Sequence, residues 1–452
     1  MKIDIFLIDE KSSIKEALAK IDVNGHGIIF AQKRSGEVIG VATDGDIRRS
    51  LIAGLDLDSQ VIECINKDFY WEHPDTSRET LIKKLDHQIR VIPLLDGDMK
   101  LVDVITKENL PEIEERPVYA RSQSPVRISF GGGGSDLTHY FSDGIGAVIN
   151  ATISFYSHAT LHIRDDSKII INSLDLNASL KADSLDELLK ATGNFGLIQA
   201  VIKTVNPEHG FELDLHSDFP MSSGLGGSAV VAATILGCFN EFRKDQWSLH
   251  ELSELAYQAE RLHQGVEGGW QDQYATIFGG FNFIEFQMDQ NIVYPLRIPS
   301  DNLSELEETL VLCNTGIKHD SGNIHKDQRN QMKQKDVQAL VQKNVELCYK
   351  IRNELLRGEL LEFGASLNNA WQLKRRLSAE ISNAHLDEIY SNAITNGAIG
   401  GKLLGAGGGG FFLFFVPPSK KHHLLSHLTS AGLEVKPFRF ESEGLKSWKV
   451  RV

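Results

Sequence analysis

The segment from Pro220 to Ala229 carries residue types that bind phosphate, reading Pro-Met-Ser-Ser-Gly-Leu-Gly-Gly-Ser-Ala. It ends a predicted strand and leads into an apolar stretch, so its loop lies at a helix N-terminus. The first four N–H groups of a helix lack internal partners and carry about half a positive charge, which suits an anion. Glycines let the backbone approach that anion, and Ser228 could also ligate Mg²⁺. The predicted contacts are Ser222, Ser223, Gly224, Leu225, Gly226, Gly227, Ser228 and Ala229.

The residues alone leave three interpretations of this segment open. The first is a glycine-rich turn with packing duties only. The second is a dinucleotide-binding fold, because Gly224–Ala229 matches G-x-G-x-x-A. The acidic residue expected about twenty positions later is missing, since Asp245 lies in a polar stretch. The third is a cradle for a nucleoside triphosphate, which is not a Walker A loop because Leu403 follows Gly401-Lys402.

Two further segments concentrate glycine beside polar residues. One reads PVRISFGGGGSD over residues 125–136, and the other reads GKLLGAGGGG over residues 401–410. Ser135 and Asp136 are short polar groups after a glycine run, so they could reach a ligand directly or form an Asx turn. We expect the last segment to close on the ligand. The predicted substrate contacts in these segments are Gly134, Ser135, Asp136, Gly407 and Gly408.

Taken in order, the three segments resemble the three motifs of the GHMP small-molecule kinases, which include galactokinase, homoserine kinase, mevalonate kinase and phosphomevalonate kinase. The resemblance extends over roughly residues 120–452. Residues 127–136, 371–378 and 397–411 are most similar to the D-glycero-D-manno-heptose 7-phosphate kinases. The resemblance implies an α/β (α+β type) fold in two parts with mixed sheets.

The same resemblance implies roles for four side chains around a bound ATP. Ser228 and Glu260 would hold Mg²⁺ through hard oxygen ligands. Asp272, in Gly-Gly-Trp-Gln-Asp-Gln-Tyr, would accept the proton of the attacking hydroxyl. Arg127 would neutralise developing charge or keep Asp272 ionised. The plainer alternatives are a solvated helix acid for Glu260 and a helix N-cap for Asp272.

A phosphorylated sugar also needs a second anion site, for which Lys374, Arg375 and Arg376 are the candidates. Arginine suits bidentate contact with phosphate. Neighbouring helix residues point in different directions, so at most two of the three can converge, and the run could instead be a solvated face. Lys318 and His319 stand where the family usually has Arg, which leaves the exact sugar or its phosphate open.

These residues need strands and helices to position them. A capping box, Ser248-Leu-His-Glu251, predicts a helix start directly after it. The apolar pattern predicts strands over residues 126–130, 147–159 and 211–215. It predicts helices over residues 225–242, 249–264, 327–356 and 386–395.

The first 112 residues form a separate unit with a tandem repeat of helix and strand pair. The stretch Gly-Val-Ala-Thr-Asp-Gly-Asp at residues 40–46 resembles the signature of a CBS domain. In that family a Thr and an Asp bind a nucleotide ribose, which implies Thr43 and Asp46 as contacts for an adenine nucleotide. The second copy has Asn109 where Asp is usual and Asp103 where Gly is usual. Alternatively, Asp-Gly is only a turn and the module merely dimerises.

Composition excludes several classes. A length of 452 residues indicates two to three domains. Lys and Arg number 47 against 61 Asp and Glu, a net charge of −14, which disfavours binding to nucleic acid or anionic lipid. The four cysteines form no C-x-x-C pair, and the sequence shows neither a signal peptide nor a membrane span, so we expect a cytoplasmic protein without disulfides. The expected divisions are residues 1–112, a linker 113–122, and kinase parts 123–310 and 311–452.

We therefore predict an ATP- and Mg²⁺-dependent kinase for D-glycero-D-manno-heptose 7-phosphate, acting at the anomeric hydroxyl and giving the 1,7-bisphosphate. A regulatory CBS pair would precede it and would favour a homo-oligomer, as a dimer through the CBS modules. The alternatives are a fucose- or galactose-type kinase and a non-catalytic nucleotide-sensing protein. A sugar nucleotidyltransferase is disfavoured because no G-x-G-T-R-L loop follows a first strand.

Overall fold

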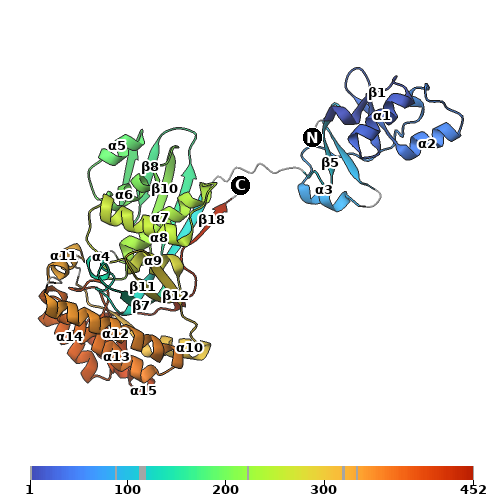
Figure 1. Cartoon of the computed structure of the whole chain (residues 1–452). Helices are drawn as coiled ribbons and strands as arrows, with labels where there is room; N and C mark the ends of the chain where they lie inside the picture. The colour runs from blue at the N-terminus through green and yellow to red at the C-terminus, as the bar shows by residue number, and fades with distance from the viewer. Residues whose placement is uncertain are drawn as a thin grey trace. The chain divides into compact units, whose positions relative to one another are not determined.

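A computed structural model describes residues 3–86, 89–110, 119–220, 223–317, 321–331 and 334–450 of the chain. Packing divides the chain into two compact units, Met1–Glu115 and Arg116–Val452 (Figure 1). Each unit has hydrophobic clusters of its own. In the described ranges no helix is long and apolar enough to cross a membrane.

The first unit contains the same arrangement twice. In the first copy, β1 (Leu7–Asp9) runs parallel to β2 (Ile28–Gln32), which pairs antiparallel with β3 (Val38–Thr43). In the second copy, a parallel bridge from Glu72 to Leu94 precedes the antiparallel pair β4 (Val91–Leu95) and β5 (Leu101–Thr106). The helices are α1 (Ile14–Asn24), α2 (Asp44–Ile52) and α3 (Arg78–Lys84), with 3₁₀ turns at Ile3–Phe6 and Val61–Glu63.

The two copies share one core. Phe6, Phe30 and Val38 from the first copy lie in the same buried cluster as Leu95 and Val104 from the second. A capping box begins α1: the Ser13 hydroxyl accepts from the backbone N–H of Glu16, and the Glu16 carboxylate accepts from the N–H of Ser13.

The larger unit is built on a nine-stranded mixed sheet within the described residues. Its central strand, β7 (Gly146–Ile163), pairs along its length with β6 (Tyr119–Gly131), so the last four residues of the predicted linker belong to the sheet. Most residues of both strands are buried, which fits their apolar and β-branched composition. The other strands are β8 (Ile169–Ser173), β9 (Ala178–Ala182), β10 (Phe211–Ser217), β11 (Phe281–Phe286), β12 (Asn291–Pro295), β17 (Phe440–Glu441) and β18 (Lys446–Val450).

Helix α7 (Gly227–Phe242) packs against β6 and β7 and is apolar nearly all round, as a fully buried helix must be. The helices α6 (Gly196–Val205), α8 (Leu249–Gln258) and α9 (Gln271–Phe278) pack around it. This unit also contains two short helices, α4 (Thr138–Phe141) and α5 (Leu185–Lys190). The capping box predicted at Ser248 is confirmed. The helix after it ends as a π-helical turn at Ala259–His263, and such turns are frequent at functional sites.

A second, four-stranded sheet has the order β14 (Gly400–Leu403), β15 (Phe411–Phe415), β13 (Leu310–Asn314) and β16 (Glu434–Lys436). Its helices include α10 (Ser300–Thr309), α14 (Ala384–Thr395) and α15 (Pro418–Ser430), with a 3₁₀ turn at Ala379–Ile381.

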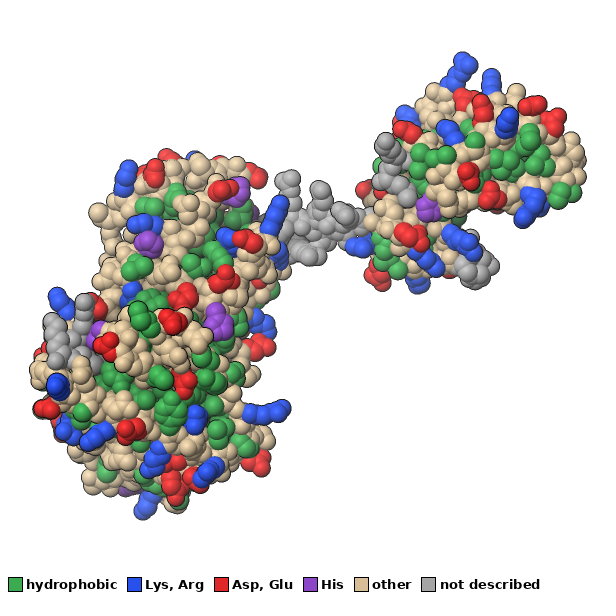
Figure 2. Space-filling model, viewed as in Figure 1, with side chains coloured by type: hydrophobic (Ala, Val, Ile, Leu, Met, Phe, Trp, Pro, Cys, Tyr) green, Lys and Arg blue, Asp and Glu red, His purple; other side chains and the backbone are tan. Residues whose placement is uncertain are grey.

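The helix predicted over residues 327–356 is wrong in its start, because α11 (Ser321–Gln331) and α12 (Lys335–Arg357) are separate. The sequence reasoning missed α13 (Leu360–Arg375), which packs on α12 and β14. Figure 2 shows acidic and basic side chains interspersed over the viewed face of each unit.

Candidate active site

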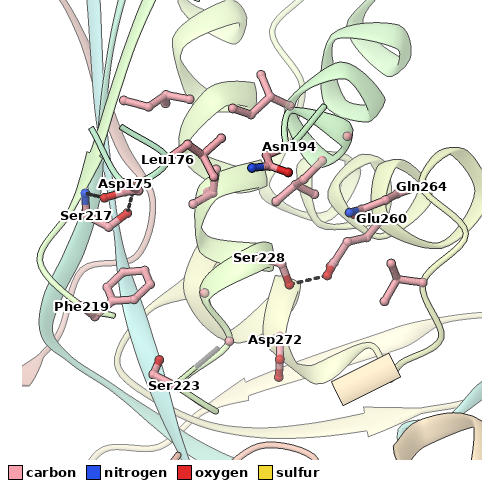
Figure 3. Close-up of a pocket in the computed structure, with 18 of the residues that line it drawn as sticks. Asp175, Leu176, Asn194, Ser217, Phe219, Ser223, Ser228, Glu260, Gln264 and Asp272 are labelled. Carbon is pink, nitrogen blue, oxygen red and sulfur yellow. Dashed lines mark hydrogen bonds between the residues drawn. The ribbon is translucent and has the colours of Figure 1, made fainter. Parts of the chain in front are cut away.

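A cleft of about 490 Å³ opens at the N-terminus of α7. Figure 3 shows Ser228, Glu260 and Asp272 toward one end of this cleft, and Asp175, Leu176 and Asn194 toward the other. Leu176 and Phe219, among other apolar side chains, line the wall between polar groups. An apolar slot with a helix N-terminus at one end has the chemistry to hold a nucleotide base and its phosphates.

The loop before α7 takes a conformation that requires glycine. Gly226 caps α7 with φ +83°, and Gly224 has φ +77°. A Cβ on Gly226 would lie 3.3 Å from Asp272 Oδ2, so a side chain there would crowd the carboxylate. Because the first amides of α7 lack partners within the helix and the glycines beside them carry no side chain, these amides are available to an anion at this end of the cleft.

The three glycine-rich segments pack against one another. The backbone N–H of Arg127, in the first segment, donates to the Leu225 carbonyl at 3.2 Å. A Cβ on Gly405, in the third segment, would lie 2.6 Å from Gly224 Cα, and one on Gly410 would lie 2.4 Å from the Ser223 carbonyl oxygen. Backbone meets backbone at these points, so only glycine allows the contact.

Asp272 lies in the first turn of α9 and forms a bidentate ion pair with Arg127. Arg127 Nε donates to Asp272 Oδ1 at 2.9 Å and Nη2 donates to Oδ2 at 2.8 Å. The remaining guanidinium nitrogen, Nη1, donates to the Gly224 carbonyl at 2.8 Å. Arg127 is buried while the Asp272 side chain keeps 25% exposure, so the carboxylate faces the cleft with its orientation fixed.

Ser228 and Glu260 meet directly across the cleft (Figure 3). The Ser228 hydroxyl donates to Glu260 Oε1, and Gln273 Nε2 donates to Glu260 Oε2 at 2.6 Å. This hydroxyl–carboxylate pair fits Mg²⁺, which prefers hard oxygen ligands. Within the described ranges no group of three His, Cys, Asp or Glu side chains could hold a metal ion. A metal at this pair would therefore complete its coordination with nucleotide phosphates and water.

A second, smaller cavity of about 40 Å³ adjoins the cleft, and Arg127, Arg261, Asp272 and Gly405 line both. Asp136 lies in its wall and accepts from the N–H groups of Gly134 and Gln271 at 3.0 and 3.2 Å. Burial, together with the nearby charge of Asp272, raises the pKa of Asp136. A Cβ on Gly269 would lie 1.9 Å from the Asp136 carboxylate, so this glycine makes room for it.

Lys374 is also buried beside the small cavity. Its ammonium donates to the carbonyls of Leu403 and Gly405, at 2.9 and 2.5 Å. Burial, followed by repulsion from Lys402 and Arg127, lowers the pKa of Lys374 well below its usual value. The three predicted basic residues do not converge. Arg375 pairs with Asp387 at 2.6 Å, and with Arg376 it lines a different groove, between α12 and α13.

The remaining predicted contacts lie as follows. Gly134 lines the small cavity, and Ser223, Gly224, Gly226 and Gly227 line the cleft. The Ser135 hydroxyl is buried and donates to the carbonyls of Gly132 and Ala147, so it holds its own loop. The side chains of Leu225 and Ala229 are buried outside the cleft lining. Gly405 and Ala406 line the cavities, whereas Gly407 and Gly408 pack against Ile381. Ser222, Lys318 and His319 lie outside the described residues.

The sequence reasoning missed several residues of the site. Arg261 follows Glu260 directly and lines both cavities, and Gln273 follows Asp272 and contacts Glu260. The adjacency of each to a predicted residue was a usable signal. At the far end of the cleft, Asp175 accepts from the N–H and hydroxyl of Ser217, both at 2.9 Å. No local pattern marks that contact.

In the first unit, Thr43 and Asp46 form the capping box of α2. Thr43 donates its N–H and its hydroxyl to Asp46 Oδ2, at 2.9 and 2.6 Å. Burial alone would raise the pKa of Asp46, but hydrogen bonds from Thr43 and Arg49 outweigh it and lower the pKa below its usual value. In the second copy, the Asn109 N–H donates to the Thr106 hydroxyl at 3.1 Å.

Comparison with known proteins gives the same assignment from independent information. Residues 194–280 match the model of the GHMP kinases N terminal domain, residues 351–432 match GHMP kinases C terminal, and residues 61–112 match the CBS domain. The D-glycero-alpha-D-manno-heptose 7-phosphate kinase of Campylobacter jejuni is 37% identical over 336 residues, which are 73% of this chain and 99% of the relative. The chain belongs to the GHMP kinase family.

Solved structures agree with this membership. A Campylobacter jejuni structure is 36% identical with a TM-score of 0.61, covering 74% of this chain and 99% of its own. The structure of a D-glycero-D-manno-heptose 1-phosphate kinase from Bacteriodes thetaiotaomicron is 30% identical with a TM-score of 0.60. The match covers 74% of this chain and 100% of that structure. The GHMP kinase fold with an N-terminal CBS domain is thus shown, and membership in this kinase family implies ATP as the phosphoryl donor.

Proposed function

We propose that this GHMP kinase phosphorylates D-glycero-D-manno-heptose 7-phosphate at the anomeric oxygen O1, giving the 1,7-bisphosphate. The observation that carries the proposal is the position of Asp272. Arg127 holds its carboxylate where the cleft at the start of α7 meets the smaller cavity. The relative in Campylobacter jejuni, a D-glycero-alpha-D-manno-heptose 7-phosphate kinase, supports the heptose 7-phosphate acceptor. An anomeric hydroxyl is more acidic than an ordinary alcohol, so a carboxylate is a sufficient base.

In the proposed reaction, ATP lies in the cleft with its phosphates at the N-terminus of α7. Asp272 accepts the proton of the acceptor hydroxyl while that oxygen forms a bond to the γ-phosphorus. The bond from the γ-phosphorus to the bridging oxygen breaks, and its electron pair stays with ADP. Ser228 and Glu260 would hold Mg²⁺, which supplies positive charge beside the phosphates. Asp136 and Gly134 would contact the sugar from the small cavity.

A panel of acceptors tests this proposal. Heptose 7-phosphate, free heptose, fucose and galactose are offered with ATP, ADP release is followed, and products are identified by phosphorus NMR. We expect turnover with heptose 7-phosphate and a new signal from a phosphate on the anomeric carbon. Preference for fucose or galactose would favour the alternative of a fucose- or galactose-type kinase, which more distant relatives of those names support.

A conservative variant separates an enzyme from a nucleotide-sensing protein. Asp272→Asn keeps the shape of the side chain but cannot take the proton, so turnover should fall by roughly 10²–10⁴-fold while ATP still binds. Loss of ATP binding together with turnover would point to a structural role for Asp272 instead.

We also propose that the CBS unit binds an adenine nucleotide at Thr43 and Asp46. The capping box places the Asp46 carboxylate at the start of α2 with partial exposure, where a ribose could replace its contact with Thr43. Calorimetric titration of AMP, ADP and ATP into the wild type and Asp46→Ala tests this site. Equal affinity in both proteins would count against it.

A further inference from the structure

One cation at the boundary of the two cavities has no role in the proposed reaction. Arg261 lies in the π-helical turn directly after Glu260, and its side chain keeps 12% exposure. It lines both the nucleotide cleft and the smaller acceptor cavity. A phosphoryl group passing from one cavity to the other must pass this boundary.

The loop 266–269 holds the Arg261 guanidinium in place without exhausting its donors. Nη1 donates to the Val266 carbonyl at 3.1 Å and Nη2 to the Gly269 carbonyl at 3.3 Å. Arginine carries five N–H donors, and the described part of the chain gives no hydrogen bond to the other three. Nε is buried without a partner, so the free donors that reach the cavities belong to the Nη atoms.

Several groups surround this guanidinium. A Cβ on Gly268 would lie 2.2 Å from Arg261 Nη2, so a side chain at this position would displace the guanidinium from its present place. The guanidinium lies 3.5 Å from Glu260 Oε1 and 5.6 Å from the centre of the Tyr257 ring, which itself stacks on Trp270.

The other two cations at the boundary differ from Arg261 in their partners or their position. Arg127 gives Nε and Nη2 to Asp272 and Nη1 to the Gly224 carbonyl. Lys374 gives two bonds to carbonyls and lines only the small cavity. Among the described side chains that line both cavities, Arg127 is bound to the Asp272 carboxylate and keeps 3% exposure, whereas Arg261 donates its hydrogen bonds to backbone carbonyls and keeps 12% exposure. Arg261 is therefore the cation whose remaining Nη donors are better exposed to a ligand.

We propose that Arg261 is a catalytic residue that binds the γ-phosphoryl group during its transfer. The inference rests on the proposed function. As the acceptor oxygen bonds to the γ-phosphorus and the bond to ADP breaks, the equatorial oxygens carry negative charge that a guanidinium can bind in bidentate fashion. The acceptor proton goes to Asp272 and the electron pair of the broken bond to ADP.

Arg261→Ala tests the proposal with two readouts. The turnover number should fall by about 10²–10³-fold, in line with the effect of arginines on phosphoryl transfer. Affinity for a non-hydrolysable ATP analogue should fall about tenfold, while affinity for ADP, which lacks the γ-phosphate, stays within about twofold. Added guanidinium should restore part of the turnover, and Arg261→Lys should restore the ATP preference only in part.

Arg243→Ala is the matched control, because Arg243 pairs with Asp245, stacks on Trp247 and lines neither cavity. It should match the wild type in both readouts. Equal losses of ATP-analogue and ADP affinity in Arg261→Ala, or unchanged turnover, would overturn the inference. A wild type that phosphorylates no acceptor would defeat the proposed function, while the ATP-against-ADP comparison would still decide on Arg261.

Discussion

Asp272 and Lys402 are charged side chains in two different environments, one half-buried at the cleft and one buried in the core. Asp272 lies against a guanidinium that bonds both of its oxygens, so its charge is paired and its direction fixed. Among the described residues, Lys402 in β14 has no such ion-pair partner, and its ammonium donates to the carbonyl of Ser129 in β6 at 2.7 Å. Burial, with repulsion from Arg127, lowers the pKa of Lys402 to about 7.

This difference predicts a pH dependence of stability. An unfolded lysine keeps its proton to about pH 10.4, so between pH 7 and that value the unfolded chain binds more protons than the folded one. The free energy of unfolding therefore rises with pH in this window. We expect the wild type to gain on the order of 2 kcal/mol relative to Lys402→Met between pH 7 and 9, measured by urea unfolding.

Lys420→Met is the control for that measurement, because Lys420 is exposed on α15. It should keep the slope of the wild type. If Lys402→Met also keeps that slope, the buried ammonium does not titrate as described.

At the scale of elements, the site is a junction of loops held together by backbone contact. The start of α7, the end of β6 and the turn between β14 and β15 meet at Gly224, Arg127 and Gly405. None of these elements positions the phosphate loop alone. A Cβ at this contact must push two loops apart, so we expect the affinity for the nucleotide to fall.

Gly405→Ala isolates this contact. Its Cβ would lie 2.6 Å from Gly224 Cα, and φ is +67°. Gly432→Ala is the matched control, because Gly432 has a similar φ of +75° but a Cβ there would have nothing within 4 Å. Gly432→Ala should lose about 1 kcal/mol of stability from the left-handed conformation alone, and Gly405→Ala should lose more because its Cβ also meets backbone. Only Gly405→Ala should weaken ADP binding, by roughly tenfold or more in a calorimetric titration. Equal affinity in the two variants would show that the loops do not depend on one another.

At the scale of the whole molecule, the two units have separate cores. The Campylobacter jejuni relative aligns over 99% of its length with 73% of this chain, so a related kinase lacks a CBS unit in that alignment. Nucleotide binding to the first unit, as proposed, would then act on the kinase as regulation and not as chemistry.

A chain starting at Tyr119 tests this division. It keeps β6 whole and every described residue of the cleft. We expect it to fold cooperatively, to bind ADP as the full chain does, and to keep turnover within roughly threefold. Adenine nucleotides added at a site outside the cleft should change turnover only in the full chain. Aggregation of the shorter chain would show instead that the first unit stabilises the second.

The sequence by itself determined the features that depend on interactions between neighbouring residues. The capping boxes at Ser13 and Ser248, the strands at β6, β7 and β10, and the glycine loop at α7 all follow from local spacing, because caps, alternation and turns are short-range interactions. The resemblance of three glycine segments gave the kinase family, and with it Asp272 and Glu260.

Only the tertiary structure decided which side chains meet. Lys374 and Arg375 are adjacent in sequence, yet one faces the small cavity and the other the α12–α13 groove, because successive helix residues point about 100° apart. The close backbone contact between Gly405 and Gly224 joins segments that are far apart in the chain. No local pattern records such a contact, since its energy comes from the packing of complete elements against one another.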